Sequence, residues 1–389
     1  MTQLKTNKTR EPEFERSLWY TQLVNPETDW EKLTRDFSFV AEMQACPQDP
    51  VFHAEGDVWT HTCMVVKALK ASSAFAALSA DRQQVLLIAS LMHDIGKPAT
   101  TIHEWDEALQ RQRVRQPGHS RLGAHMAWDY LTRLGAPSRL KQDVYELISW
   151  HQRPFHIWTA KDMLRSAISY SLVGRWCELM CLVEADNHGR MSSQTQNAEE
   201  NFSLLRTWLQ EHDLLDQPWL FANAESRMQY FEKNIRSPYY AAQEEKGSNV
   251  VLLCGLAGAG KDTYADNVLK DYPQISLDVL RKSMGIEHGE NQGAVIQAAY
   301  AQARVYLRAK KPFVWNATNI TSELRKKVIS LFRSYHAHVS IHVLDRPFDQ
   351  IVQQNNTREA VIPNIVLERM LSKFEPPTLL EAHEVLWIE

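Results

Sequence analysis

The chain has few cysteines and lacks any apolar run long enough to cross a membrane. Its five cysteines show no Cys-x-x-Cys spacing. This odd count, without a secretory apolar region at the N-terminus, favours a reducing compartment and argues against a disulfide scaffold. The most apolar run, residues 250–254 with the loop after it, is interrupted by Lys261, far short of the roughly 20 residues of a membrane span. We therefore expect a cytoplasmic protein with no membrane partner.

Excess positive charge is also absent, because the formal net charge is −4. There is thus no global attraction to nucleic acid, and any such binding must depend on local basic patches. The length of 389 residues exceeds one ordinary hydrophobic core, which favours two domains. The charged and apolar fractions, 23% and 44%, are typical of a globular protein.

The first half of the chain, which holds most of the histidines and tryptophans, has the periodicity of helices. Apolar residues recur at three- and four-residue spacing, and no convincing strand alternation is present. The helices that this spacing predicts span residues 60–71, 82–93, 121–134, 139–150 and 172–188. A polar, turn-rich stretch at 236–249 has no periodic apolar face, and we interpret it as a linker.

The pattern after the linker changes to short buried strands that alternate with helices. The predicted strands are 250–254, 275–277, 313–316 and 339–344, and the predicted helices are 262–271, 291–310, 322–335, 348–355 and 363–374. Such alternation implies a parallel sheet covered on both faces. We therefore predict a multidomain protein, with an all-α domain at 1–238 followed by an α/β domain at 248–389.

Two adjacent potential metal ligands, His93 and Asp94, lie at the end of an apolar helix and precede a Gly-Lys pair. Neutral imidazoles and carboxylates are common ligands of divalent cations. Asp186 closes a long amphipathic helix that would otherwise bury its acidic end without reason. A bound metal supplies that reason, because it neutralises the carboxylate and deprotonates water near neutral pH.

The pair His93-Asp94 with its Gly-Lys resembles the signature of the HD phosphohydrolase superfamily. The segment 55–66, which contains His61, is similar to the first-histidine segment of HD domains attached to bacterial tRNA nucleotidyltransferases. Five segments match in the correct order over about residues 50–190, including histidines typical of two-metal HD enzymes and a closing aspartate. The metal ligands that the resemblance implies are His61, His93, Asp94, His119, His151 and Asp186.

Within that set, the resemblance assigns His119 and His151 to a second metal or to the substrate phosphate. His125 is a weaker competitor for a ligand role, and we interpret His53, His103, His156, His188 and His212 as structural or solvated. Lys97 and Arg190 are cationic neighbours of ligands. Both can hold a phosphate or stabilise charge that develops on it.

The second half opens with a phosphate-binding loop of the GxxxxGK type, directly after a buried strand and before a helix. Backbone N–H groups of such a loop face the phosphates, and its lysine reaches the transferred phosphate. The residues that we expect to bind the nucleotide are Gly255, Gly258, Gly260, Lys261, Asp262 and Thr263. Asp262 departs from the usual Ser or Thr that binds magnesium, although an aspartate can also hold Mg²⁺.

The residues after this loop favour a kinase. Asp278 at a strand end can accept a hydroxyl proton, and Arg281 one turn later can hold an acceptor phosphate. Arg358 lies in a segment typical of a lid over the donor phosphates. No strand ends in Asp-Glu and no guanine-reading motif is present, which disfavours an ATP-driven motor or a hydrolytic switch. The order of these elements resembles the polynucleotide 5′-kinase family, with Asn316 in place of the aspartate of its Asp-Ala-Thr-Asn strand.

Together, the two halves resemble the bacterial HD-Pnk end-healing enzymes. This resemblance implies that the first domain opens 2′,3′-cyclic phosphates and removes 2′-phosphates, and that the second transfers the γ-phosphate of ATP or another NTP to 5′-OH ends of RNA or DNA. The implied cofactors are Mg²⁺ or Mn²⁺ at the kinase site and one or two divalent transition-metal ions at the HD site. A ligase that acts downstream is an implied partner, and the oligomeric state stays open.

Three alternatives remain from the sequence. The first is a nucleotidase joined to a nucleoside kinase, which would perform the same chemistry on small nucleotides. The second is a nucleotide sensor without catalytic activity, which the complete ligand set and Asp278 disfavour. The third is a tRNA-end enzyme, which the missing nucleotidyltransferase domain disfavours.

Overall fold

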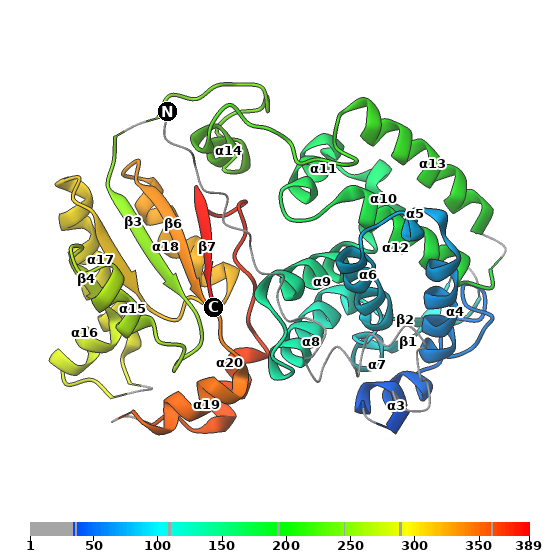
Figure 1. Ribbon diagram of the computed structural model, residues 1–389, viewed down its shortest axis with the longest axis horizontal. Helices are drawn as coiled ribbons and strands as arrows, with labels where there is room; N and C mark the ends of the chain where they lie inside the picture. The colour runs from blue at the N-terminus through cyan, green and yellow to red at the C-terminus, as the bar shows by residue number, and fades with distance from the viewer. Residues whose placement is uncertain are drawn as a thin grey trace, which may run out of the picture.

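The computed structural model describes residues 34–35, 37–107, 110–192, 195–244, 246–287, 290–358 and 361–389. The start of the predicted first domain, residues 1–33, lies outside the described residues. A helical body and a body built on a parallel sheet lie side by side (Figure 1). This arrangement confirms the predicted fold class. The domain boundaries at 238 and 248 stay a prediction.

The helical body contains the five helices that the apolar spacing predicts. They are α4 (Val58–Ala71), α6 (Ala80–Met92), α8 (His119–Arg133), α9 (Ser138–Trp150) and α12 (Trp176–His188). Helix α4 begins at Asp57, whose carboxylate accepts a hydrogen bond from the backbone N–H of Thr60 at 2.8 Å, a common N-cap. Helix α4 packs against α6 and α12, and α9 packs against α6 and α8. These contacts gather the ends of all five helices around one centre.

Shorter elements complete this body. They are α3 (Ser38–Gln44), α5 (Ser73–Ala76), α7 (Lys97–Thr100), α10 (Arg153–His156), the 3₁₀ helix η2 (Ile157–Thr159), α11 (Met163–Ser171), α13 (Thr195–Glu211) and α14 (Ala224–Phe231). The predicted helix 172–188 was too long, because it begins only at Trp176. Gly174 interrupts it: a Cβ there would come within 2.6 Å of the Tyr170 ring, so only glycine lets that ring close over the turn.

The expectation that the first half lacks strands was wrong. Strands β1 (Ile102–Asp106) and β2 (Arg111–Arg115) form an antiparallel hairpin. Its side chains are mostly polar, so the apolar alternation that reveals a half-buried strand is missing. Ion pairs across the strands, Arg113–Asp106 at 2.9 Å and Arg115–Glu104 at 2.7 Å, take the place of apolar cross-strand contacts.

The second body is a five-stranded parallel sheet in the order β4-β5-β3-β6-β7. The strands are β3 (Asn249–Cys254), β4 (Gln274–Ser276), β5 (Phe313–Asn316), β6 (His338–Leu344) and β7 (Glu384–Ile388). The helices are α15 (Lys261–Val268), α16 (Leu277–Ser283), α17 (Gln292–Arg308), α18 (Ser322–Arg333), α19 (Phe348–Asn356) and α20 (Asn364–Leu371). The four strands and five helices predicted for this half are all present. Sequence reasoning missed α16 and β7, an edge strand that is only partly buried.

Strand β7 forms the edge of the sheet that faces helices α8 and α9 (Figure 1). At this interface Trp128 of α8 stacks on Phe374 with ring centroids 5.0 Å apart and contacts Trp387 of β7 at 5.8 Å. Lys141 of α9 is almost fully buried and pairs with Asp345, which follows β6, at 2.7 Å. Apolar stacking and a buried ion pair therefore hold the two bodies together.

Helix α14 adds a second contact, although it precedes the linker in sequence. Arg227 donates hydrogen bonds to the carbonyls of Leu379 at 3.0 Å and Ala382 at 3.2 Å, and Glu225 pairs with Arg333 of α18 at 2.7 Å. None of the helices in the described part of the chain combines the length and apolar character of a transmembrane segment.

Replacing Lys141 with Ala should lower the free energy of unfolding by about 3 kcal/mol, because the largely buried carboxylate of Asp345 keeps only the hydroxyl of Ser138 and loses its cation. Thermal or urea unfolding of the full chain measures this effect. Lys67→Ala, at an exposed position of α4, is the control and should change stability little. An equal, small effect of both substitutions would show that the buried pair does not stabilise the interface.

Candidate functional site

The ends of five helices bring the predicted metal ligands together in the helical body. His61, His93, Asp94, His151 and Asp186 are at most 1% exposed. Two triplets of ligand atoms, His61-His93-Asp94 and Asp94-His119-His151, each have all their atoms within 4.8 Å of one another. Asp186 joins the cluster through His61, whose Nε2 lies 3.0 Å from its carboxylate. Asp94 belongs to both triplets. The arrangement thus suits two metal ions that share one carboxylate.

The orientation of the imidazole rings fits metal binding. The Nδ1 atoms of His93, His119 and His151 lie 2.7–2.8 Å from the carbonyl oxygens of residues three positions earlier. An Nδ1–H that donates to a carbonyl leaves the lone pair on Nε2, which is the usual arrangement of a histidine that binds metal. The Nε2 atoms point toward Asp94, at 3.1 Å for His93, 3.4 Å for His119 and 3.8 Å for His151.

Two buried atoms at this centre have no hydrogen-bond partner among the described residues: Nε2 of His93 and Oδ1 of Asp94. Buried polar atoms are normally satisfied, and both atoms are of the kind that binds divalent cations. Burial lowers the pKa of His151 to about 3, and the nearby His119 lowers this pKa further. This histidine is therefore neutral and free to act as a ligand. The residues of the site fit a metal centre.

Cationic side chains hold the two aspartates. Lys97 Nζ lies 2.7 Å from Asp94 Oδ2, and Arg190 Nη2 lies 2.6 Å from Asp186 Oδ2. Burial alone would raise the pKa of both carboxyl groups. Interactions with His93 and the Lys97 ammonium outweigh this effect at Asp94, and the Arg190 guanidinium outweighs it at Asp186. Both pKa values fall well below the usual range, so the site keeps two negative charges.

Glu55 is a member of this site that sequence reasoning did not identify. Its buried carboxylate lies 3.0 Å from Nδ1 of His61, while Nε2 of the same ring lies 3.0 Å from Asp186. His53, interpreted from sequence as structural, bonds to Glu55 at 2.8 Å. A carboxylate behind a ligand histidine fixes its tautomer and ring orientation. The signal was available in the sequence, because Glu55 begins the segment that resembles HD domains.

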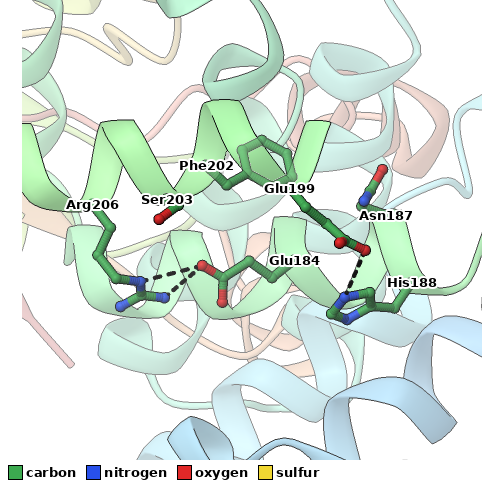
Figure 2. Close-up of a pocket in the computed structure, with 7 residues that line it drawn as sticks. All are labelled: Glu184, Asn187, His188, Glu199, Phe202, Ser203 and Arg206. Carbon is green, nitrogen blue, oxygen red and sulfur yellow. Dashed lines mark hydrogen bonds and ion pairs between the residues drawn. The ribbon is translucent and has the colours of Figure 1, made fainter. Parts of the chain in front are cut away.

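Other histidines lie outside this cluster. His125, the competitor for a ligand role, points to the interface, where its Nδ1 bonds to the carbonyl of Phe374 at 3.1 Å. His188 pairs with Glu199 at 3.3 Å, in a hollow of about 300 Å³ between α12 and α13 (Figure 2). Because Glu184 and His188 lie one turn apart on the face of α12 opposite Asp186, this hollow is separate from the metal centre.

The phosphate-binding loop connects β3 to α15. Gly255, Gly258 and Gly260 all have positive φ, at 151°, 84° and 89°. At Gly255 a Cβ would come within 2.7 Å of the Leu344 carbonyl, so a side chain there would push the loop away from β6. Lys261 Nζ donates to the carbonyls of Gly255 at 3.1 Å and Leu256 at 2.8 Å. The lysine therefore closes over the loop that we expect to hold the phosphates.

The other predicted kinase residues surround this lysine. Asp278, in the first turn of α16, forms an ion pair with Arg281, whose Nε also bonds to Gln292 at 3.1 Å. The Asp278 side chain is 64% exposed and thus accessible to an acceptor. Burial lowers the pKa of Lys261 to about 8, and the charges of Asp278 and Arg358 also act on it. Asp262, Asp278 and Arg358 therefore lie within electrostatic reach of Lys261.

Asn355 is a second residue that sequence reasoning missed. It is fully buried, and its side chain bonds to both backbone groups of Ile362, with Nδ2 to the carbonyl at 2.7 Å and Oδ1 to the N–H at 3.0 Å. These bonds clamp the two ends of the segment that carries Arg358. Asn355 also lies next to the phosphate loop, because a Cβ placed on Gly258 would lie 3.5 Å from the Cβ of Asn355. The same residue therefore contacts both that segment and the phosphate loop.

Comparisons with known proteins agree with this geometry. A family described as HD domain matches residues 58–178, and a family described as AAA domain matches residues 250–377. The chain therefore joins an HD domain to a P-loop kinase domain. The presence and order of these two domains confirm what the HD-Pnk resemblance predicts, and they are the domains of a phosphohydrolase and a kinase.

Two curated relatives match shorter stretches. The multifunctional CCA protein of Halorhodospira halophila is 36% identical over 105 residues, which cover 27% of this chain and 21% of that protein. The bifunctional polynucleotide phosphatase/kinase of Schizosaccharomyces pombe is 26% identical over 162 residues, which cover 39% of this chain and 36% of that protein. The chain thus spans about a fifth and about a third of the relatives that it matches.

Among solved structures, a gluconokinase from Sinorhizobium meliloti aligns with 36% of this chain and 81% of its own, at 16% identity and a TM-score of 0.27.

Replacing Glu55 with Gln should weaken metal binding about 10- to 100-fold, because the tautomer and orientation of His61 lose their fixed partner. Competition with a chelator, followed by metal analysis, measures the affinity. Glu42→Gln, at an exposed position of α3, is the matched control. Wild-type metal affinity in the Glu55 variant would show that Glu55 does not position the ligand.

Affinity for ATP should fall as the pH rises through about 8, because Lys261, whose pKa lies there, then loses the charge that attracts phosphate. Calorimetric titration with ATP between pH 7.5 and 9.5 tests this. The Lys261→Met variant should bind weakly and with little pH dependence over the same range. A pH-independent affinity of the wild-type protein would contradict the expected role of the lysine charge.

Proposed function

We propose that this protein repairs broken polynucleotide ends with two separate active sites. In this proposal, residues 1–238 form a metal-dependent phosphoesterase that opens 2′,3′-cyclic phosphates and removes 2′-phosphates, with 3′-phosphates as a further substrate class. Residues 248–389 form a kinase that transfers the γ-phosphate of ATP or another NTP to a 5′-OH. The products would be ends that a separate ligase can join.

The observation that carries the proposal is the presence of both sites on one chain. The two triplets around Asp94 suit phosphate removal, and the lysine of the phosphate loop lies within electrostatic reach of Asp278. A phosphatase and a kinase on one small molecule would cancel each other. On a strand break they would act on opposite sides, and the fission yeast relative is likewise a bifunctional polynucleotide phosphatase/kinase.

In the phosphoesterase, one or two divalent ions held by the six predicted ligands would supply a hydroxide near neutral pH. Lys97 and Arg190 hold the two aspartates through ion pairs. In this proposal their charges would offset the charge that grows on the phosphate oxygens as the bond to the leaving oxygen breaks. His119 is more exposed than the other ligands, and in this proposal it would be the ligand nearest to the incoming strand end.

In the kinase, Asp278 would accept the proton of the attacking 5′-hydroxyl, and Arg281 would hold the neighbouring phosphate of the acceptor strand. Lys261 and Arg358 would stabilise the transferred phosphoryl group, whose charge is spread over its oxygens. The ion pair of Arg281 with Asp278 would orient this carboxylate toward the hydroxyl from which a general base takes its proton. Mg²⁺ or Mn²⁺ would accompany the nucleotide.

Replacing Asp278 with Ala should lower kinase activity about 100- to 10,000-fold, the usual contribution of a general base, and spare the phosphoesterase. Asp94→Ala should do the reverse. The substrate is an oligonucleotide with 5′-OH and 2′,3′-cyclic phosphate ends, incubated with ATP and Mg²⁺, Mn²⁺ or Ni²⁺, and mass spectrometry follows both ends.

Asp271→Ala, at an exposed position between α15 and β4, controls for loss of a carboxylate and should keep both activities. Loss of both activities in either of the first two variants would contradict two independent sites. Phosphorylation of nucleosides but not of oligonucleotides would instead favour an enzyme of small nucleotides.

A further inference from the structure

The phosphate loop departs from the common pattern at the residue after its lysine. P-loop enzymes generally hold Mg²⁺ with a Ser or Thr at this position and with an aspartate from a neighbouring strand. Here the residue after Lys261 is Asp262. An extra carboxylate at this position would add a second negative charge to the metal site if the strand aspartate were also present.

The neighbouring strand carries the opposite departure. Strand β5 pairs with β3 in the register Leu252–Trp315, and its last residue, Asn316, therefore lies beside the start of the phosphate loop. Asn316 is 4% exposed, and its Nδ2 donates a hydrogen bond to Oδ1 of Asp262 at 2.7 Å. The two residues that differ from the common pattern are thus in direct contact, although they are 54 positions apart.

The two departures compensate each other chemically. A hydroxyl has become a carboxylate on α15, and a carboxylate has become an amide on β5, so the site still has one carboxylate. Two carboxylates at this separation would repel, and one would have to take up a proton. An amide at position 316 removes the repulsion and donates to the carboxylate instead. Asp262 is also exposed, so its carboxylate remains accessible to a metal ion from solvent.

We propose that Asp262 supplies the carboxylate oxygen for the divalent ion that accompanies the nucleotide, and that Asn316 positions this carboxylate. The carboxylate of the metal site therefore comes from the residue after the loop lysine, and the neutral side chain comes from the strand. This inference rests on the proposed kinase function. The roles given to Asp262 and Asn316 concern only the binding of metal and nucleotide, so they can be tested without a phosphoryl acceptor.

Calorimetric titration of the full chain with ATP, once with Mg²⁺ and once with EDTA, tests whether Asp262 supplies the metal-binding carboxylate. Asp262→Ser should weaken the Mg²⁺-dependent part of ATP affinity about tenfold, the effect of losing one close charge interaction. The double substitution Asp262→Ser with Asn316→Asp should restore most of that part, because it moves the carboxylate to the strand. Asp266→Ser removes a carboxylate from the same helix, where it bonds to Gln274, and should leave affinity unchanged.

The single substitution Asn316→Asp gives an independent readout. It should lower the melting temperature in EDTA, because it places two carboxylates together, and Mg²⁺ should raise that temperature more than in the wild-type protein. A merely structural asparagine would not produce this metal dependence.

Unchanged Mg²⁺ dependence in Asp262→Ser, or a double variant no better than that single variant, would overturn the inference. A wild-type protein that binds Mg²⁺ and ATP in this way but does not phosphorylate 5′-OH oligonucleotides would sink the proposed function and leave this inference standing.

Discussion

The charge of a buried carboxylate, Asp94, organises the helical domain. A carboxylate removed from water is costly unless cations or hydrogen-bond donors compensate it. One lysine contacts Asp94 directly, while the surrounding imidazoles have their Nδ1 atoms turned to backbone carbonyls and their Nε2 atoms turned inward. One end of each of five helices lies at this centre, and these ends carry His61, His93-Asp94, His119, His151 and Asp186. The packing of the domain and its metal chemistry thus have the same origin.

Helix α8 connects this centre to the kinase domain. Its first residue, His119, belongs to the metal cluster, while Trp128 stacks on Phe374 and Arg133 lies 4.6 Å above the ring of Phe348. Phe348 begins α19, whose Ile351 backs the phosphate loop at Gly258. A helix is a stiff element, so these contacts set the distance and orientation between the two sites. They give one chain a fixed geometry between its phosphohydrolase-type and kinase-type domains.

The parts that could be predicted from the sequence are those with local signals. The His93-Asp94 pair, the glycine-rich loop and the helical periodicity lie in short windows, and the structure places their residues as expected. The hairpin β1–β2 was not predicted because ion pairs, rather than alternating apolar residues, link its strands. Glu55 and Asn355 escaped as site residues because their roles depend on what they contact: a histidine ring behind a metal centre and the backbone of a loop.

The sequence by itself therefore determined the two domains, their order and the chemical type of each site, because ligand residues and phosphate loops are recognisable from residue type and spacing. Only the tertiary structure decided which groups compensate one another. Asp262 and Asn316 each look like a defect in the chain, yet they meet at 2.7 Å and balance the charge of one site. The physical reason is that charge balance is a property of contacts in space, and parallel strands bring together residues that the sequence keeps far apart.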